Sequence, residues 1–227
     1  MSLPKKLAQG VRRPIGRVLA LARHSASYPF DTPLTREIHR LERRWSEKPL
    51  RAMGDLPGLE PPPRHGLTGL AYQVVRHYKP RVVVQLGARD GLAALAIGAA
   101  LRDTAEGGKL YLVDDSRGDD DQPWMGHRAR LGLDAAIVPL RMGHDAARDQ
   151  VARPIDLLVI DAGRSRQAVE GDWDDYAAIV RPGGMVLFPG VRSDPEVRRF
   201  WRSMTRNHEN HSVRRHQGLG VIRTKAQ

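Results

Sequence analysis

Apolar residues in this chain gather in short β-branched runs that alternate with longer stretches at helical spacing. Strands that alternate with helices in this way predict a parallel sheet with right-handed crossovers. From residue 66 onward the runs predict strands at 81–86, 109–113, 136–140, 155–160 and 184–188, and helices at 91–102, 123–132, 144–152, 167–180 and 194–206.

Two further short strands, 211–216 and 219–223, end the pattern. Only Gln217 and Gly218 separate them, which is too little chain for a crossover, so they are expected to pair as an antiparallel hairpin. The sequence therefore predicts an α/β domain with a doubly wound, mostly parallel seven-stranded sheet that ends in this hairpin.

The N-terminal part of the chain has a different pattern. Pro14 can begin a short helix, and Thr32-Pro33 marks the start of a second one with apolar residues at helical spacing. Five prolines and two glycines lie between Lys48 and Arg64 and predict a linker. We therefore predict a basic helical extension with a linker over residues 1–64 and one domain over residues 65–227.

Positive charge is concentrated at the two ends of the chain. The formal net charge is +11, with +7 in residues 1–64, −2 in residues 65–195 and +6 in residues 196–227. Clusters of Lys and Arg neutralise phosphates, so charge alone permits a nucleic-acid partner. Aromatic residues are only 5% of the chain and no base-stacking platform is visible, which disfavours that class but leaves it open.

Composition excludes several other classes. The chain of 227 residues has no cysteine, which excludes disulfides and thiolate metal sites. No apolar run approaches 18 residues, and Arg17 and Arg23 interrupt the N-terminal apolar segment, which argues against a membrane span and a secretory signal. A cytoplasmic protein is the expectation.

The first 30 residues carry six basic side chains and no acidic one. The predicted helix after Pro14 is amphipathic, and such a helix can lie on an anionic surface at the inner membrane face. Its apolar residues Ile15, Val18 and Leu19 can instead dock on the helices of the sheet or on a second subunit in a homodimer. We favour docking.

The segment Val82 to Gly91, VVVQLGARDG, carries the main chemical signal. An apolar strand stops at Gly87, Gly91 follows four residues later, and an alanine-rich helix begins at once. Glycines there let the backbone turn tightly and approach a ligand beside the free N–H groups of the helix. A dinucleotide fingerprint is G-x-G-x-x-G, whereas the pattern here is G-x-x-x-G, which suits a ligand without a pyrophosphate.

The end of the next strand complements this turn. The strand 109–113 is followed by Asp114 and Asp115, which are well placed to accept hydrogen bonds from the hydroxyl groups of a ribose. Asp114 is the better candidate because it directly follows the strand. The turn and the acidic strand end together predict a nucleoside cofactor.

These features resemble motif I of the class I S-adenosylmethionine-dependent methyltransferases. The likeness covers roughly residues 66 to 223 and is closest to the catechol O-methyltransferase-like and cephalosporin-hydroxylase-like branch. It includes the Lys79-Pro80 that leads into motif I, Ile160-Asp161-Ala162, Pro182-Gly183-Gly184, and the terminal strand Gly218 to Ile222. The resemblance implies a Rossmann-like sheet and S-adenosylmethionine as cofactor.

The resemblance also implies the residues that surround the cofactor. The family has an acidic residue where this chain has Gln85, so the part that Gln85 plays in ordering the loop is open. Relatives contact the adenine just after the third strand, where Gly143 and His144 stand. The predicted cofactor-binding set is Gln85, Gly87, Ala88, Arg89, Gly91, Asp114, Asp115, Gly143, His144 and Asp161.

Chemistry is expected beyond the fourth strand, because open α/β sheets bind ligands at the carboxyl ends of their strands. Asp161 is the predicted general base or acceptor-orienting group, with His144 as the second candidate. Alternatively, Asp161 only caps a loop, and His144 is a surface histidine. Arg164, Arg166 and Arg192 lie on loops at the same rim and are candidates to bind a phosphate, carboxylate or uronic acid on the substrate.

The oxygen ligands of the metal-dependent relatives are incomplete. In those relatives Asp161 would begin a motif resembling I-D-A-D-H-S-Y, and a second aspartate ends the fifth strand. This chain has Gly163 and Arg164 in the first motif and Pro189 near the second position. One carboxylate holds a hard dication weakly, so no catalytic metal is expected. His208 and His211 could form a metal pair, although a solvated helix end explains them more simply.

The sequence therefore predicts an S-adenosylmethionine-dependent O-methyltransferase that acts on a small-molecule or glycan acceptor in natural-product or polysaccharide synthesis. Three alternatives stay open. The first is a nucleic-acid (RNA) methyltransferase, and the second is a non-catalytic member that binds the cofactor or a partner as a scaffold. The third, a dehydrogenase, is disfavoured by the glycine spacing and by the terminal hairpin.

Overall fold

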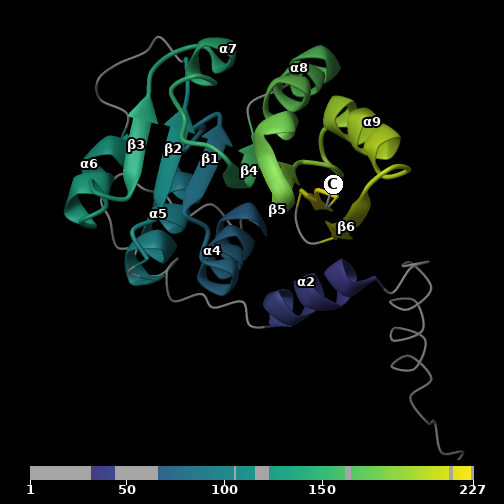
Figure 1. Ribbon diagram of the computed structural model, residues 1–227, viewed down its shortest axis with the longest axis horizontal. Coiled ribbons are helices and arrows are strands. Elements are labelled where there is room, and N and C mark those ends of the chain that lie inside the picture. The colour runs from purple at the N-terminus through teal and green to yellow at the C-terminus, as the bar shows by residue number, and fades with distance from the viewer. Residues whose placement is uncertain are drawn as a thin grey trace, which may run out of the picture. The chain divides into compact units, whose positions relative to one another are not determined.

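A seven-stranded sheet of order β3-β2-β1-β4-β5-β7-β6 organises the chain in the computed structural model (Figure 1). The structure describes residues 32–43, 66–104, 106–115, 123–161, 165–214 and 217–225. The strands are β1 (Val82–Leu86), β2 (Lys109–Val113), β3 (Ile137–Leu140), β4 (Ile155–Ile160), β5 (Val180–Pro189), β6 (Glu209–Val213) and β7 (Leu219–Arg223).

The first five strands run parallel, and β7 pairs antiparallel with both β5 and β6. The predicted terminal hairpin is therefore confirmed, with β7 inserted between β5 and the edge strand β6. The doubly wound α/β sheet predicted from the sequence is confirmed with it.

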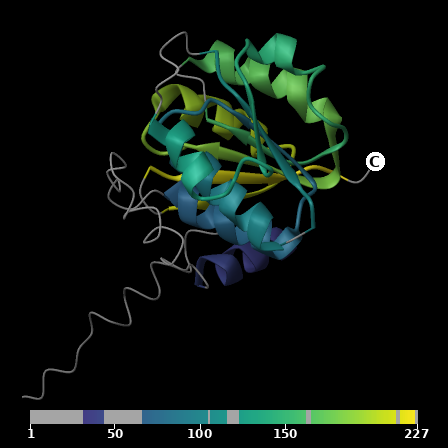
Figure 2. The same cartoon turned by 90° about the vertical axis from the view of Figure 1, so that its left-hand side faces the viewer.

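Helices cover both faces of this sheet (Figure 2). Successive strand residues point to opposite faces, so Val83 belongs to one hydrophobic cluster and Val84 to the other. The first cluster is formed with α2 (Pro33–Arg43), α4 (Gly66–Tyr78), α5 (Leu92–Thr104) and α6 (Pro123–Arg130), and the second with α7 (His144–Ala147), α8 (Arg166–Tyr176) and α9 (Pro195–Met204).

The strand order reverses direction between β1 and β4. The chain leaves β1 toward β2 and β3, and it returns to place β4 on the other side of β1. Leu86 at the end of β1 is paired with Ile160 at the end of β4, and the Asp161 amide donates a hydrogen bond to the Leu86 carbonyl at 2.9 Å. This switch point is where open α/β sheets bind ligands, and it brings the glycine loop close to Asp161.

Helix α2 packs on the same compact unit as the sheet, although it lies within the segment 1–64 that the sequence assigns to the extension. Its side chains Leu34, Ile38 and Leu41 are buried in the first cluster. Glu37 forms an ion pair with Arg223 of β7 at 2.6 Å. The predicted helix at Pro14 and the linker 48–64 lie outside the described residues.

Some predicted element boundaries are wrong. The helix predicted at 144–152 ends at Ala147, and a turn follows it, although Ala147 and Val151 are both buried. The strand predicted at 184–188 starts earlier, at Val180, and the register shift against β4 shows that the Pro182-Gly183-Gly184 segment bulges out of the pairing. The strand predicted at 211–216 is Glu209–Val213, and the helix predicted at 167–180 ends at Tyr176 before a single 3₁₀ turn, Ala177–Ile179.

Within the described ranges, no helix combines the length and the apolar character that crossing a membrane requires. The predicted contact of the N-terminal basic helix with a membrane or a second subunit falls outside those ranges and stays a prediction.

Candidate functional site

The loop between β1 and α5 has the geometry that its glycines predict. Gly87 and Gly91 have φ angles of +88° and +74°, and Arg89 between them has a φ angle of +49°. The Gly87 amide donates to the carbonyl of Val113 on β2 at 2.8 Å. The Asp114 carboxylate accepts from the Ala88 amide at 2.6 Å, so the acidic end of β2 holds the loop in place.

Gln85 of β1 stabilises the loop through its buried side chain. Its side chain is fully buried, and its Nε2 donates to the Gly87 carbonyl at 2.8 Å. An ionised carboxylate only accepts hydrogen bonds, so an acidic residue could not make this contact. Gln85, Ala88 and Gly91 do not line a described cavity, and these three predicted cofactor residues shape the loop instead.

A cavity of about 550 Å³ opens at the carboxyl ends of β1, β2 and β4. It contains the other seven residues of the predicted cofactor set, which are Gly87, Arg89, Asp114, Asp115, Gly143, His144 and Asp161. The sequence analysis missed five residues of its wall, which are Asp145, Ala168, Gly171, Asp172 and Asp175. Six of the twelve lining residues are therefore aspartates, and the cavity is suited to a ligand that carries positive charge.

His144 is fixed by one of these missed aspartates. Its Nδ1 donates to Asp172 Oδ1 at 2.6 Å. Burial opposes protonation of the ring, but the hydrogen bond to Asp172 and the nearby Asp115 and Asp114 carboxylates outweigh it and raise the pKa of His144. The raised pKa favours the protonated ring, which offsets part of the negative charge of the wall and cannot accept a proton.

Asp161 and Arg89 form an ion pair at the centre of the site. Arg89 Nη1 lies 3.2 Å from Asp161 Oδ1, and the aspartate side chain is only 9% exposed. Burial raises the pKa of Asp161 to about 7, although the Arg89 guanidinium opposes the shift. A carboxylate with a pKa near physiological pH is suited to accept a proton.

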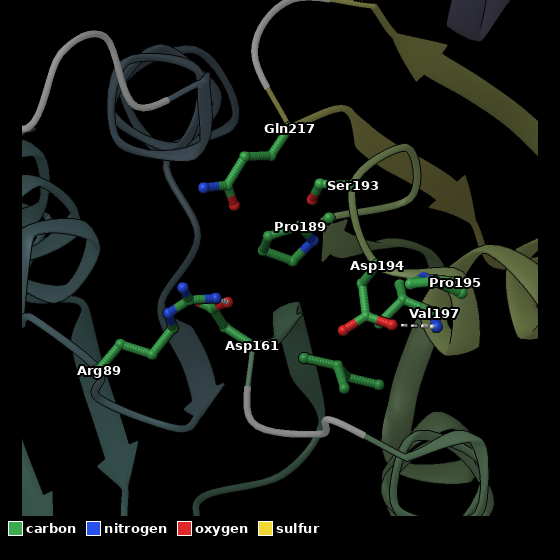
Figure 3. A pocket seen from close by; sticks show the side chains of 10 residues that line it. Arg89, Asp161, Pro189, Ser193, Asp194, Pro195, Val197 and Gln217 are labelled. Carbon is green, nitrogen blue, oxygen red and sulfur yellow. Dashed lines mark hydrogen bonds and ion pairs between the residues drawn. The ribbon is translucent and has the colours of Figure 1, made fainter.

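A second cavity, of about 360 Å³, lies on the other side of this ion pair at the ends of β4 and β5 (Figure 3). Arg89 and Asp161 line both cavities. Figure 3 shows Arg89 and Asp161 together at one side of the second cavity and Asp194, Pro195 and Val197 at the opposite side. The pair therefore stands where a ligand in the first cavity would meet a ligand in the second.

The arginines predicted to bind substrate are arranged differently. Arg166 pairs with Glu170 one turn along α8 at 2.7 Å, and Arg192 donates to the carbonyl of Arg214 at 2.7 Å. Neither residue lines either cavity, and Arg164 lies outside the described residues. Among the arginines that the structure describes, Arg89 lines both cavities, and the sequence analysis assigned it to the cofactor only.

The sequence analysis placed the second metal ligand of the metal-dependent relatives at the end of β5. Pro189 lines the cavity at the end of β5. Asp194, which the sequence analysis missed, lies nearby, but its Oδ1 accepts from the amides of Glu196 and Val197 and caps α9 (Figure 3). The Asp194-Pro195 pair could have indicated this capping role, since aspartate before a proline is typical of a helix start.

Residues 84–189 match a family model described as a methyltransferase domain. Among solved structures, the chain is similar to a putative caffeoyl-CoA O-methyltransferase from Staphylococcus aureus, with a TM-score of 0.59 and 11% identity over 92% of this chain and 97% of the other. It is also similar to a Podospora anserina methyltransferase with bound S-adenosylhomocysteine, with a TM-score of 0.58 and 13% identity over 98% of this chain and 100% of the other.

A third similar structure is an O-methyltransferase from Streptomyces achromogenes in complex with S-adenosylmethionine, described as involved in tomaymycin synthesis. Its TM-score is 0.57, with 14% identity over 90% of this chain and 95% of the other. At these identities the solved structures establish the fold, and the matched segment spans the glycine loop, Asp114 and Asp161. The chain therefore has the fold of these methyltransferases, as the sequence predicts, and its residues 84–189 match the model of a methyltransferase domain.

Proposed function

We propose that the protein is an S-adenosylmethionine-dependent O-methyltransferase that uses Asp161 as its general base and no catalytic metal. The observation that carries the proposal is the Arg89–Asp161 ion pair, which lines both cavities at the switch point of the sheet. The cofactor would occupy the larger cavity and the acceptor the smaller one.

The residues of the larger cavity fit the cofactor. Asp114 and Asp115 follow β2 and offer carboxylate oxygens to the ribose hydroxyls, as the resemblance implies. S-adenosylmethionine carries a sulfonium and an ammonium group, and the six aspartates of the wall favour both. When bound, the cofactor supplies a methyl group on a positively charged sulfur, which becomes a neutral thioether once the methyl group has left.

The protein's own part is to orient the acceptor and to take its proton. An acceptor hydroxyl in the second cavity would donate to Asp161, and the proton passes to this carboxylate as the oxygen bonds to the methyl group. Arg89 holds the carboxylate in position and keeps a fraction of it ionised, because it opposes the effect of burial on the pKa. Holding two reactants at the attack distance supplies a large part of the rate in such a displacement.

The second cavity favours a small acceptor. Its volume of about 360 Å³ lies at the lower end for small-molecule sites, and Ser193, Gln217 and Arg89 give it polar groups. These groups suit a hydroxylated small molecule or the end of a glycan. An acceptor in natural-product or polysaccharide synthesis is therefore our proposal for the substrate class.

Calorimetry on the full-length chain tests the proposal. We expect saturable one-to-one binding of S-adenosylhomocysteine and no comparable binding of NAD. Mass spectrometry of the purified protein would identify a co-purified nucleoside. Preferential binding of NAD would overturn the proposal, whereas cofactor binding without methyl transfer to any hydroxylated acceptor would favour the non-catalytic alternative.

Replacing Asp114 tests the cofactor end of the site. Asp114→Asn keeps the shape of the side chain but removes its charge, and we expect affinity for S-adenosylhomocysteine to fall by about 1–3 kcal/mol, roughly 5- to 150-fold. Asp149→Asn is the control, because Asp149 lies in neither cavity wall and is 80% exposed. If Asp115→Asn weakens binding and Asp114→Asn does not, Asp115 is the ribose ligand instead.

Removal of divalent cations tests the metal-free mechanism. Arg89 already provides a positive charge beside Asp161, so we expect turnover on any acceptor that the enzyme methylates to persist in excess EDTA. Initial rates with and without the chelator give the comparison. Loss of turnover in EDTA that magnesium restores would contradict the proposed role of Arg89.

A further inference from the structure

Three side chains of the types that bind metal ions lie together where α2 meets the edge strand β6. His39 and Glu42 belong to α2, and His211 belongs to β6. The donor atoms of the three side chains all lie within 4.8 Å of one another. None of the three residues lines either cavity of the methyltransferase site.

The local structure brings these residues together. His39 and Glu42 are three residues apart, so they share one face of α2, beside the buried positions Ile38 and Leu41. His211 alternates with Val213 on the inward face of β6 and is only 2% exposed. The sequence analysis preferred a solvated helix end for His211, and this interpretation is wrong because the ring packs edge-on against His39, with centroids 4.8 Å apart.

We propose that His39, Glu42 and His211 bind a divalent late transition-metal ion, with Zn²⁺ as the best fit. Two imidazole nitrogens and one carboxylate oxygen form a common zinc ligand set that leaves a fourth position for water. An ion held at about 2.0–2.1 Å would place the ligand atoms roughly 3.3 Å apart. The donors lie within 4.8 Å of one another, so the partly exposed side chains of His39 and Glu42 would rotate toward the ion on binding.

The surroundings of His211 suit a metal ligand. Its ring is buried and lies edge-on against the ring of His39, so the two imidazoles are held where one ion could reach both. Glu42 supplies the negative charge that partly neutralises a dication.

The proposed ion would fasten α2 to the sheet. Polar contacts already join them, since the Leu34 amide donates to the Glu209 carboxylate at 3.1 Å and Glu37 forms an ion pair with Arg223. A metal bond between α2 and β6 would add to these contacts and would hold the helix against the edge strand (Figure 1). Its role is structural and separate from methyl transfer.

Titration of the untagged full-length chain with Zn²⁺ tests the site. After removal of metal with a chelator, we expect one equivalent of Zn²⁺ to bind with a dissociation constant below about 10 µM and to raise the melting temperature. His39→Ala and Glu42→Gln should each weaken this binding at least tenfold, because even outer-sphere partners of metal ligands cost 10- to 100-fold. These two partly exposed positions are used because a change at the buried His211 risks the fold itself.

His77→Ala is the matched control. His77 lies on α4 and contacts Glu37 of α2 at 3.1 Å, so its loss removes a histidine beside α2 without removing a proposed ligand. Its affinity for Zn²⁺ should equal that of the wild type. No saturable binding below about 100 µM, or unchanged affinity in both His39→Ala and Glu42→Gln, would overturn the proposal.

Discussion

Asp161→Asn is expected to lower kcat by about 10²- to 10⁴-fold on any acceptor that the wild-type enzyme methylates, because asparagine cannot accept the hydroxyl proton. The affinity for S-adenosylhomocysteine should change much less, since the larger cavity keeps its other aspartates. Steady-state kinetics and calorimetry on the same preparations separate the two effects. An Asp161→Asn enzyme with wild-type kcat would show that Asp161 only positions the loop.

The pH profile gives an independent check on Asp161. Because burial raises its pKa to about 7, kcat of the wild type should rise with pH through that value as the carboxylate ionises. This rise should be absent from the residual activity of Asp161→Asn. In Arg89→Ala the rise should move to higher pH, since the guanidinium that opposes the shift is gone.

The free energy of unfolding should fall as pH rises, whereas kcat should increase. In the unfolded chain Asp161 ionises near its ordinary pKa of 3.8, whereas the folded protein binds this proton up to about pH 7. The folded state therefore loses stability as pH rises between these values, and the penalty is complete above pH 7. Melting temperatures should show Asp161→Asn gaining on the wild type across this window. Asp149→Asn, an exposed change, should show no such trend.

The sequence predicted the sheet well because the buried strands, parallel or antiparallel, are nearly continuous apolar runs. The ranges for β2, β4 and β7 agree with the structure at both ends. The end of α7 could not be found in this way, since Ala147 and Val151 have helical spacing whether or not a helix joins them. A one-turn helix has too few residues for periodicity to define it.

The candidate site was predicted in part for the same reason. Asp114 and Asp161 follow buried strands, so their places at the carboxyl edge were fixed by the strand ranges. Asp172 lies on α8 and not at a strand end. Its burial could still have been predicted from the sequence, because it lies on the same buried stripe of that helix as Val169 and Tyr176. An acidic residue on an apolar stripe calls for a partner, which the structure identifies as His144.

Arginine positions were the weakest part of the prediction. A long side chain can reach several partners, so a place on a loop does not define where the guanidinium lies. The ion pair of Arg166 with Glu170 could have been predicted from the i, i+4 spacing of the two residues. The contact of Arg89 with Asp161, in contrast, joins residues 72 positions apart. Only the folded sheet brings that second pair together.

Gly91→Ala is expected to lower the free energy of unfolding by about 2–5 kcal/mol, the largest stability effect that we predict for a single methyl group. About 1–2 kcal/mol comes from the left-handed backbone, since Gly91 has a φ angle of +74°. The rest is overpacking, because a Cβ atom at Gly91 would lie 2.3 Å from Trp124 Cβ and Cγ, in a buried contact with α6. Urea denaturation monitored by tryptophan fluorescence measures the loss.

Two alanine substitutions separate these causes. Gly107 has a φ angle of +71° and open space around its Cβ position, so Gly107→Ala should show the backbone cost alone. Gly126 lies in α6, again with open space, and Gly126→Ala should be neutral or stabilising by up to about 1 kcal/mol. The difference between Gly91→Ala and Gly107→Ala then measures the contact with Trp124.

Because this contact sets how closely the glycine loop approaches α6, Gly91→Ala should also weaken S-adenosylhomocysteine binding at temperatures where the variant is still folded. Equal stability losses in the Gly91 and Gly107 variants, with unchanged cofactor affinity in both, would show that Trp124 moves aside without cost and leaves the loop in place.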